Sequence, residues 1–140
     1  MRNNLVVLGF VVVFGMMAGI ALAGAGVEMR IDVPFDFYMG DQMFPAGQYQ
    51  FDMDHGERAT GSTVFVWAPE NAADRILSTV PGTDRTSTMN RLVFNKYGKK
   101  LFLSTVTING YKATLKVHNM ERELRAALPQ APDIVTVAQK

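Results

Sequence analysis

The sequence contains no cysteine. Disulfide bonds and thiolate chemistry are therefore excluded, and so is a bacterial lipoprotein, which needs a cysteine at its cleavage site. A domain of about 115 residues without disulfides must be stabilised by packing alone. This composition suits a bacterial periplasm or cell surface better than a small disulfide-rich secreted protein.

An excess of one charge sign is also missing, since 14 Lys and Arg residues stand against 13 Asp and Glu residues. Nothing in this balance indicates nucleic-acid binding. The charges are unevenly distributed: residues 28–84 hold ten acids and three bases, whereas residues 85–125 hold nine bases and two acids. Cross-strand pairing inside one domain explains this pattern, and head-to-tail association of molecules is the alternative.

The first 25 residues have the features of a signal peptide. Arg2 supplies the positive charge, residues 5–23 are almost continuously apolar, and small residues follow. We expect cleavage after Ala25 or Ala23 and export to the periplasm or the extracellular space. The apolar run is close to the length that spans a bilayer, so the alternative is that it stays uncleaved as a membrane anchor. We expect contact with a membrane only through such an uncleaved segment. The predicted organisation is a signal peptide over residues 1–25, one domain over residues 26–128 and a tail over residues 129–140.

Alternation of apolar and polar residues dominates the rest of the chain. Residues 27–33 and 49–54 show it most clearly, and Asn109-Gly110 between two alternating runs predicts a tight hairpin. Turns are also expected at residues 40–42, 44–47 and 97–99, and loops at residues 55–62 and 81–89. One helix is predicted to begin with Asn119 as its N-cap and to end before Pro129, followed by a tail or a weak edge strand.

These elements predict a mainly β fold. About seven or eight short strands, with turn signals every 8 to 12 residues, indicate an antiparallel sandwich or a small open barrel with one C-terminal helix. No alternation of strands and helices and no internal repeat is present.

Residues 33–51 read VPFDFYMGDQMFPAGQYQF, and they match the pattern V-P-F-x-F-x-x-G-x-x-x-x-P-A-G-x-Y. Later segments match L-x-F-x-x-Y-G-x-x-x-F-L-x-x-V at residues 92–106 and E-R-E-L at residues 121–124. These motifs resemble a family of small exported bacterial proteins, abundant in soil Acidobacteria, that has no assigned activity. The resemblance implies export and a β-rich fold. It departs at residues 115–118, where this chain reads Leu-Lys-Val-His and the family has a Leu-Pro-Lys-Ser step, so any function of that step is in doubt here.

Few residues suggest catalytic or metal chemistry. Asp52, Asp54 and His55 combine oxygen and nitrogen ligands, but their spacing is neither that of a calcium loop nor that of a zinc site. The same three residues are the weak candidates for a hydrolase. His118, next to the expected helix start, is interpreted as a capping or hydrogen-bonding residue. We assign no catalytic residue and predict no cofactor.

Two segments offer candidate contacts with a ligand or partner. Lys96, Tyr97, Lys99 and Lys100 form a basic, aromatic hairpin tip. In the opening stretch, Tyr38, Met39 and Phe44 fall outside the alternation that assigns their neighbours to a core.

The sequence thus predicts an exported β domain of unknown role, acting in non-catalytic binding or as a structural or interaction protein of the cell envelope. Its partner is not identified, and self-association or assembly into the envelope is the expectation. A carrier with an aromatic cavity for a small apolar ligand is the first alternative, and a hydrolase is the second. The aromatics that would line such a cavity, or else fill a solid core, are Phe35, Phe37, Phe44, Tyr49, Phe51, Phe65, Trp67, Phe94 and Phe102.

Overall fold

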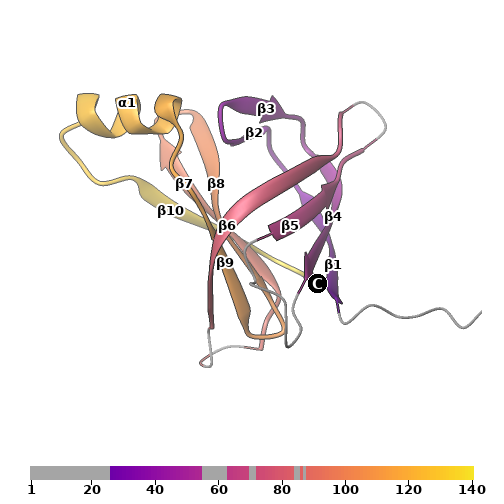
Figure 1. Ribbon diagram of the computed structural model, residues 1–140. Helices are drawn as coiled ribbons and strands as arrows, with labels where there is room; N and C mark the ends of the chain where they lie inside the picture. The colour runs from indigo at the N-terminus through magenta and orange to yellow at the C-terminus, as the bar shows by residue number, and fades with distance from the viewer. Residues whose placement is uncertain (1–25, 55–62, 70–71, 84–85, 87) are drawn as a thin grey trace, which may run out of the picture.

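The structure is a computed structural model, and it describes residues 26–54, 63–69, 72–83, 86 and 88–140. Strands dominate it, in agreement with the predicted mainly β class, and one helix lies near the C-terminus. The elements are β1 (Gly26–Val33), β2 (Phe37–Met39), β3 (Gln42–Phe44), β4 (Gly47–Asp54), β5 (Thr63–Trp67), β6 (Arg75–Thr83), β7 (Arg91–Tyr97), β8 (Lys100–Ile108), β9 (Tyr111–Leu115), α1 (Asn119–Ala127) and β10 (Asp133–Ala138) (Figure 1). No helix in the described ranges is long and apolar enough to cross a membrane.

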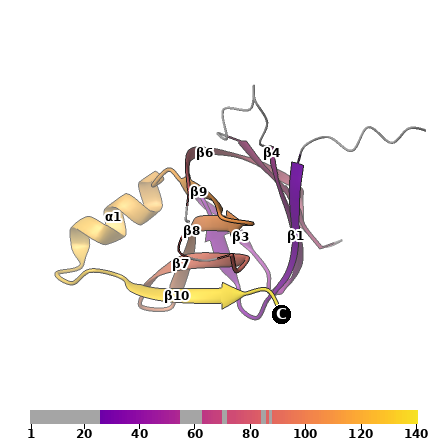
Figure 2. The same ribbon diagram turned by 90° about the horizontal axis from the view of Figure 1, so that it is seen from below.

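The strands form one strongly curved sheet that is not closed into a barrel. Its main path is β1-β4-β5-β6-β9-β8, after which β7 and then β10 continue along one side of β8. Seen from below, β1 and β10 lie at the two ends of the curl (Figure 2). The side chain of Gln139 donates from Nε2 to the carbonyl oxygen of Arg30 at 3.0 Å, and this bond joins the two edges. All pairs are antiparallel except β2 with β8, which makes the sheet mixed.

The turns follow from backbone chemistry. Asn109 and Gly110 have φ of 50° and 81°, as the predicted two-residue hairpin between β8 and β9 requires. The described residues form ten strands, against the expected seven or eight. Residues 37–44 fold into the small β2–β3 hairpin around Gly40, whose φ is 65°. Residues 133–138 form β10, which pairs with β7, so this part of the predicted tail takes its edge-strand alternative.

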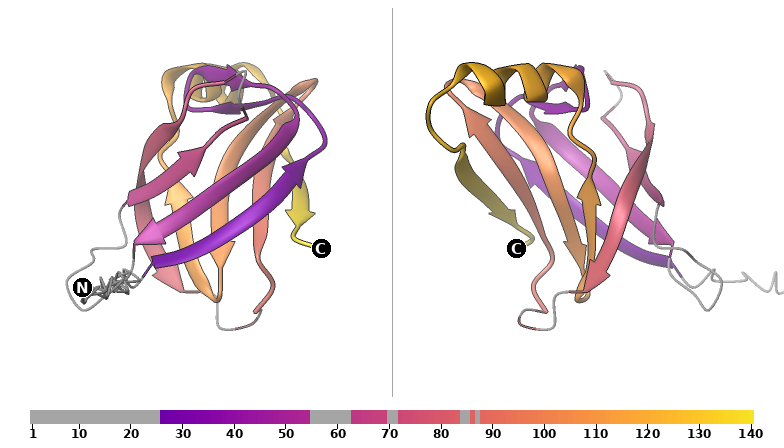
Figure 3. Two further views of the ribbon diagram at one scale, coloured as in Figure 1. Left: turned by 90° about the vertical axis from the view of Figure 1, so that its right-hand side faces the viewer. Right: turned by 60° about the vertical axis from the view of Figure 1, so that its left-hand side comes forward.

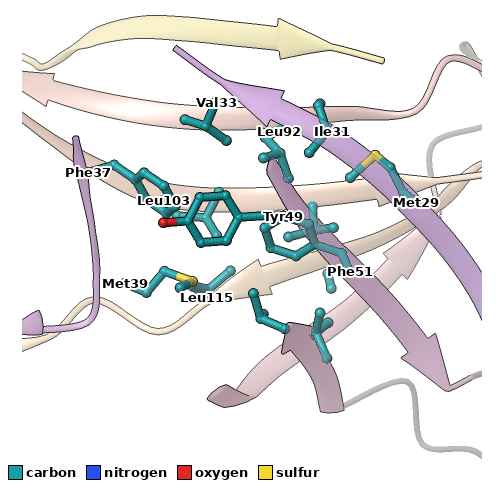
Figure 4. Packing of buried hydrophobic residues seen from close by; sticks show 14 of the residues in the cluster. Met29, Ile31, Val33, Phe37, Met39, Tyr49, Phe51, Leu92, Leu103 and Leu115 are labelled. Carbon is teal, nitrogen blue, oxygen red and sulfur yellow. The ribbon is translucent and has the colours of Figure 1, made fainter. Parts of the chain in front are cut away.

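Alternation places the core inside the curl. In β1 the side chains of Met29, Ile31 and Val33 are buried, whereas Glu28 and Asp32 are exposed. Tyr49 and Phe51 of β4 meet them from the neighbouring strand (Figure 4). Since the period of a strand is two, β1 and β4 contribute one face to this core and leave the other face outside, whereas β8 is buried on both faces from Thr105 to Ile108.

The helix start differs from the prediction. His118 is the N-cap, without a side-chain cap bond, and Asn119 is the first helical residue. The cap is supplied from a distant segment, because Asp41 of the β2–β3 turn accepts a hydrogen bond from the backbone N–H of Met120 at 3.1 Å. The His118 ring lies against Gly40, where an added Cβ would approach its Cδ2 to 3.3 Å. A long-range cap of this kind leaves no local sequence signal.

Candidate functional site

The opening stretch is a structural corner. Asp36 Oδ1 accepts a hydrogen bond from the Ala46 N–H at 2.9 Å, and the Tyr49 hydroxyl donates to the Pro45 carbonyl at 2.5 Å. Burial, assisted by the charge of Asp36, raises the pKa of Tyr49 from 10.0 to about 12. The Cβ that any other residue would carry at Gly47 would lie 2.9 Å from Pro69 Cγ, so this glycine permits a close approach of the segment after β5.

The three contact candidates in this stretch have different environments. Met39 and Phe44 are buried in the core, each about 1% exposed, which gives both a packing role. Tyr38 is half-buried on the other side of β2 and stacks on Phe102, with ring centroids 4.9 Å apart. Lys100 Nζ lies 6.0 Å from the centre of the Tyr38 ring. Tyr38 and Lys100 are therefore neighbours, which their sequence positions did not indicate.

The residues of the basic hairpin tip also differ in their exposure to solvent. Lys96, Lys99 and Lys100 are exposed, whereas Tyr97 is buried beneath α1. The Tyr97 hydroxyl donates to Glu121 Oε1 at 3.1 Å and accepts from Arg125 Nε at 2.9 Å. Burial raises the pKa of Tyr97, while its hydrogen bond with Arg125 acts in the opposite direction. Tyr97 thus anchors the helix, and the lysines alone remain available to a partner.

The candidate metal ligands lie largely outside the described residues. His55 and the side chain of Asp54 belong to that undescribed part. Asp52 is half-buried on the outer side of β4, opposite Glu28 of β1 and Phe65 of β5. Within the described ranges, no group of three or more His, Asp and Glu side chains is placed to hold a metal ion.

Most of the aromatic side chains pack on one another inside the curl. Phe37 lies at the centre, with ring centroids 5.1 Å from Tyr49, 5.4 Å from Phe94 and 6.1 Å from Phe44. Such edge-to-face and offset contacts are typical of a filled core. Phe35 is half-buried and packs on Phe94 at 5.0 Å. These aromatics fill space, which favours the solid core over the hollow carrier.

Phe65 and Trp67 are the exceptions. In β5 the buried side chains are Val64 and Val66, so Phe65 and Trp67 point to the outside. Their exposed fractions are 36% and 41%, and that of Ile76, directly opposite Phe65 on β6, is 70%. The centroids of the Phe65 and Trp67 rings lie 6.2 Å apart. We call Phe65, Trp67 and Ile76 the outer aromatic surface.

Strand register places polar side chains beside this surface. Arg30 pairs with Gln50, and Gln50 pairs with Trp67, which aligns the three side chains on the outer face of β1, β4 and β5. The left view of Figure 3 looks onto these strands. A hollow of about 410 Å³ lies here, and its lining includes Arg30, Gln48, Gln50 and Trp67. Trp67 also lines the apolar hollow of about 240 Å³ between Phe65 and Ile76.

The Trp67 position is fixed by local contacts at the end of β5. The next residue, Ala68, donates its N–H to Asp74 Oδ1 at 2.9 Å, which joins the end of β5 to the start of β6. The arrangement offers an apolar platform of two rings tilted by 34°, bordered by amide and guanidinium donors. Such a surface can hold a ligand that has one apolar face and many hydroxyl groups.

The sequence interpretation missed this surface because it counted Phe65 and Trp67 among the aromatics of a core or cavity. The signal was present, since the order Val64-Phe65-Val66-Trp67 places the two small side chains on one face and the two large rings on the other. Comparison of the chain with protein-family models, with curated proteins and with solved structures gave no match.

Proposed function

We propose that this protein is an exported, non-catalytic binding module that holds a glycan of the cell envelope on its outer aromatic surface. Export is inferred from residues 1–25, which lie outside the described structure. Cleavage after Ala25 would make Gly26, the first residue of β1, the new N-terminus and would leave the described domain intact. Membership of the exported family that the motifs resemble stays a prediction.

The observation that carries the proposal is the position of Trp67. This ring belongs both to the apolar surface with Phe65 and Ile76 and to the polar hollow with Arg30 and Gln50. Sugar rings have apolar C–H faces and a border of hydroxyl groups, so an aromatic platform beside side-chain donors matches both parts. Exposed apolar groups that gather on one face of a domain with a filled core mark an interaction site.

Intrinsic fluorescence tests the proposal, because Trp67 is the single tryptophan of the chain. The mature domain is titrated with soluble oligomers of glucose and of N-acetylglucosamine, and it is pelleted with insoluble peptidoglycan. We expect a saturable change of emission with at least one of these glycans, together with co-sedimentation. Trp67→Ala should weaken co-sedimentation at least about tenfold, which corresponds to about 1.4 kcal/mol.

Tyr111→Ala is the matched control. Tyr111 is an aromatic residue of the same exposed fraction, 41%, but it lies on β9 rather than on the outer aromatic surface. This variant should bind like the wild type. No change of Trp67 emission with any of the glycans, or equal losses in the two variants, would refute a glycan site at this surface.

A further inference from the structure

Strand β6 pairs with β9 over only part of its length, because β9 is the shorter strand. The ladder between them runs from Thr79 opposite Leu115 to Thr83 opposite Tyr111. The first four residues of β6, residues 75–78, pair with β5 on their other side. After Leu115 the chain leaves the sheet toward α1, and the right view of Figure 3 shows the two strands diverging toward the helix. Within the described residues, the side of residues 75–78 that faces away from β5 has no strand partner.

The divergence opens a cleft of about 750 Å³. One wall is β6 from Arg75 to Ser78, and the opposite wall is residues 115–118. The β2–β3 hairpin and the start of α1 complete the lining. Apolar side chains contribute to it, namely Met39, Leu77, Leu115 and Val117. The volume is within the usual range of ligand sites.

Positive charge borders this cleft. Arg75, Lys116 and Arg122 line it together with His118, and Asp41 is the one acidic residue of the lining. The Asp41 carboxylate already accepts the N–H of Met120. Arg75 is half-buried with its guanidinium 5.7 Å from the centre of the Phe44 ring, whereas Lys116 and Arg122 are exposed. The local potential therefore attracts an anionic ligand.

We propose that the cleft binds an extended acidic peptide segment, which adds to the sheet as a strand along residues 75–78 of β6. A strand edge offers alternating N–H and C=O groups, and an extended segment is the ligand that uses them in register. The apolar lining would take every second side chain, and acidic side chains would meet Lys116 and Arg122. A small anion would use the charges alone and would leave the strand edge unused. The cleft shares Arg75 and Ile76 with the lining of the hollow beside Phe65, but its proposed ligand differs from a glycan, and the proposal does not depend on the glycan surface.

Fluorescence anisotropy with a labelled hexapeptide of alternating valine and glutamate tests the proposal. Four of its residues would span the open edge at about 3.3 Å each. We expect saturable binding that weakens as salt is raised, because exposed charges are screened. The double variant Lys116→Glu/Arg122→Glu should bind at least about tenfold more weakly, as expected when two favourable charge contacts become repulsive.

Two controls separate strand addition from simple attraction of charges. The variant Lys112→Glu/Lys140→Glu makes the same change of net charge at exposed positions outside the lining of the cleft, and should keep its affinity within about twofold. A hexapeptide with the same side chains but with alternate backbone amides N-methylated cannot donate the main-chain hydrogen bonds and should lose binding. Equal binding of the methylated peptide, equal losses in both charge variants, or no binding up to about 1 mM peptide would overturn the proposal.

Discussion

Two regions of the same curved sheet differ in their outer faces, since one packs against a helix and the other is exposed to solvent. α1 covers the end of β7 that carries Asn95 and Tyr97, and polar groups hold it there: Glu121 Oε1 accepts hydrogen bonds from Asn95 Nδ2 at 2.9 Å and from the Tyr97 hydroxyl at 3.1 Å. In the described residues no helix covers the outer side of β5 and β6, which presents Phe65, Trp67 and Ile76 to solvent and which we call the bare face. The contacts beneath α1 have a structural role, because they hold the helix on β7. Folding does not explain the second arrangement, which leaves large apolar groups in water, and this difference supports the proposal that the bare face binds a ligand.

Removal of the helix anchor should give a large loss of stability. Glu121 is only 6% exposed, and Arg125 lies 3.9 Å from its carboxylate. In Glu121→Ala the amide of buried Asn95 loses its acceptor, and a cavity forms beneath the helix. We expect the free energy of unfolding to fall by about 2–3 kcal/mol in urea titrations followed by circular dichroism.

Glu123 provides the matched control, because it is an exposed glutamate on the same helix. Its replacement by alanine should change the free energy of unfolding by less than about 0.5 kcal/mol. If both variants were equally stable, α1 would not be held by this polar cluster, and the contrast between the covered and the bare face would lose its basis.

The Pro-Ala-Gly corner should respond to alkaline pH through Tyr49. The phenol keeps its proton in the folded state until about pH 12, whereas its usual pKa is 10.0. Between these values the unfolded chain releases a proton that the folded chain retains, so stability is fully present below pH 10 and falls as the pH rises toward 12. The loss attributable to this group is about 2–3 kcal/mol, and urea titrations at a series of pH values would measure it.

Tyr49→Phe removes the titrating group and keeps the ring. At neutral pH it should cost about 1 kcal/mol, because the part-buried Pro45 carbonyl loses its donor. Its stability should then decline less steeply than that of the wild type between pH 10 and pH 12. Identical slopes for the two proteins would show that the Tyr49 hydroxyl does not govern the alkaline response.

The fold was largely predictable from local signals. Period-two alternation assigned β1 and β4, and Asn109-Gly110 assigned the β8–β9 hairpin, since both depend on neighbours in sequence. The helix cap was not predictable in this way. Asp41 caps α1 across 79 positions of the chain, and only the packed structure brings the two together.

The candidate site was less predictable, for a related reason. Composition identifies Phe65 and Trp67 as large apolar residues, which a small domain normally buries. Only the register of β4, β5 and β6 places them on the same face as Gln50 and Ile76. The cleft beside β6 depends equally on where β9 stops pairing, a feature that alternation within either strand does not record.

The smallest loss of stability should come from a substitution on the bare face. The same substitution in the core serves as the comparison. Ile76→Thr affects a side chain that is 70% exposed on β6, and we expect a change of less than about 0.5 kcal/mol in the free energy of unfolding. Ile108→Thr makes the identical change at a fully buried position of β8 and should cost about 2–4 kcal/mol, because it leaves a cavity and buries a hydroxyl group. Urea titrations of the two variants in parallel compare the two losses in free energy of unfolding directly. A large loss for Ile76→Thr would mean that this face is packed against a neighbour in the free protein, and the outer aromatic surface would then belong to the fold rather than to a ligand.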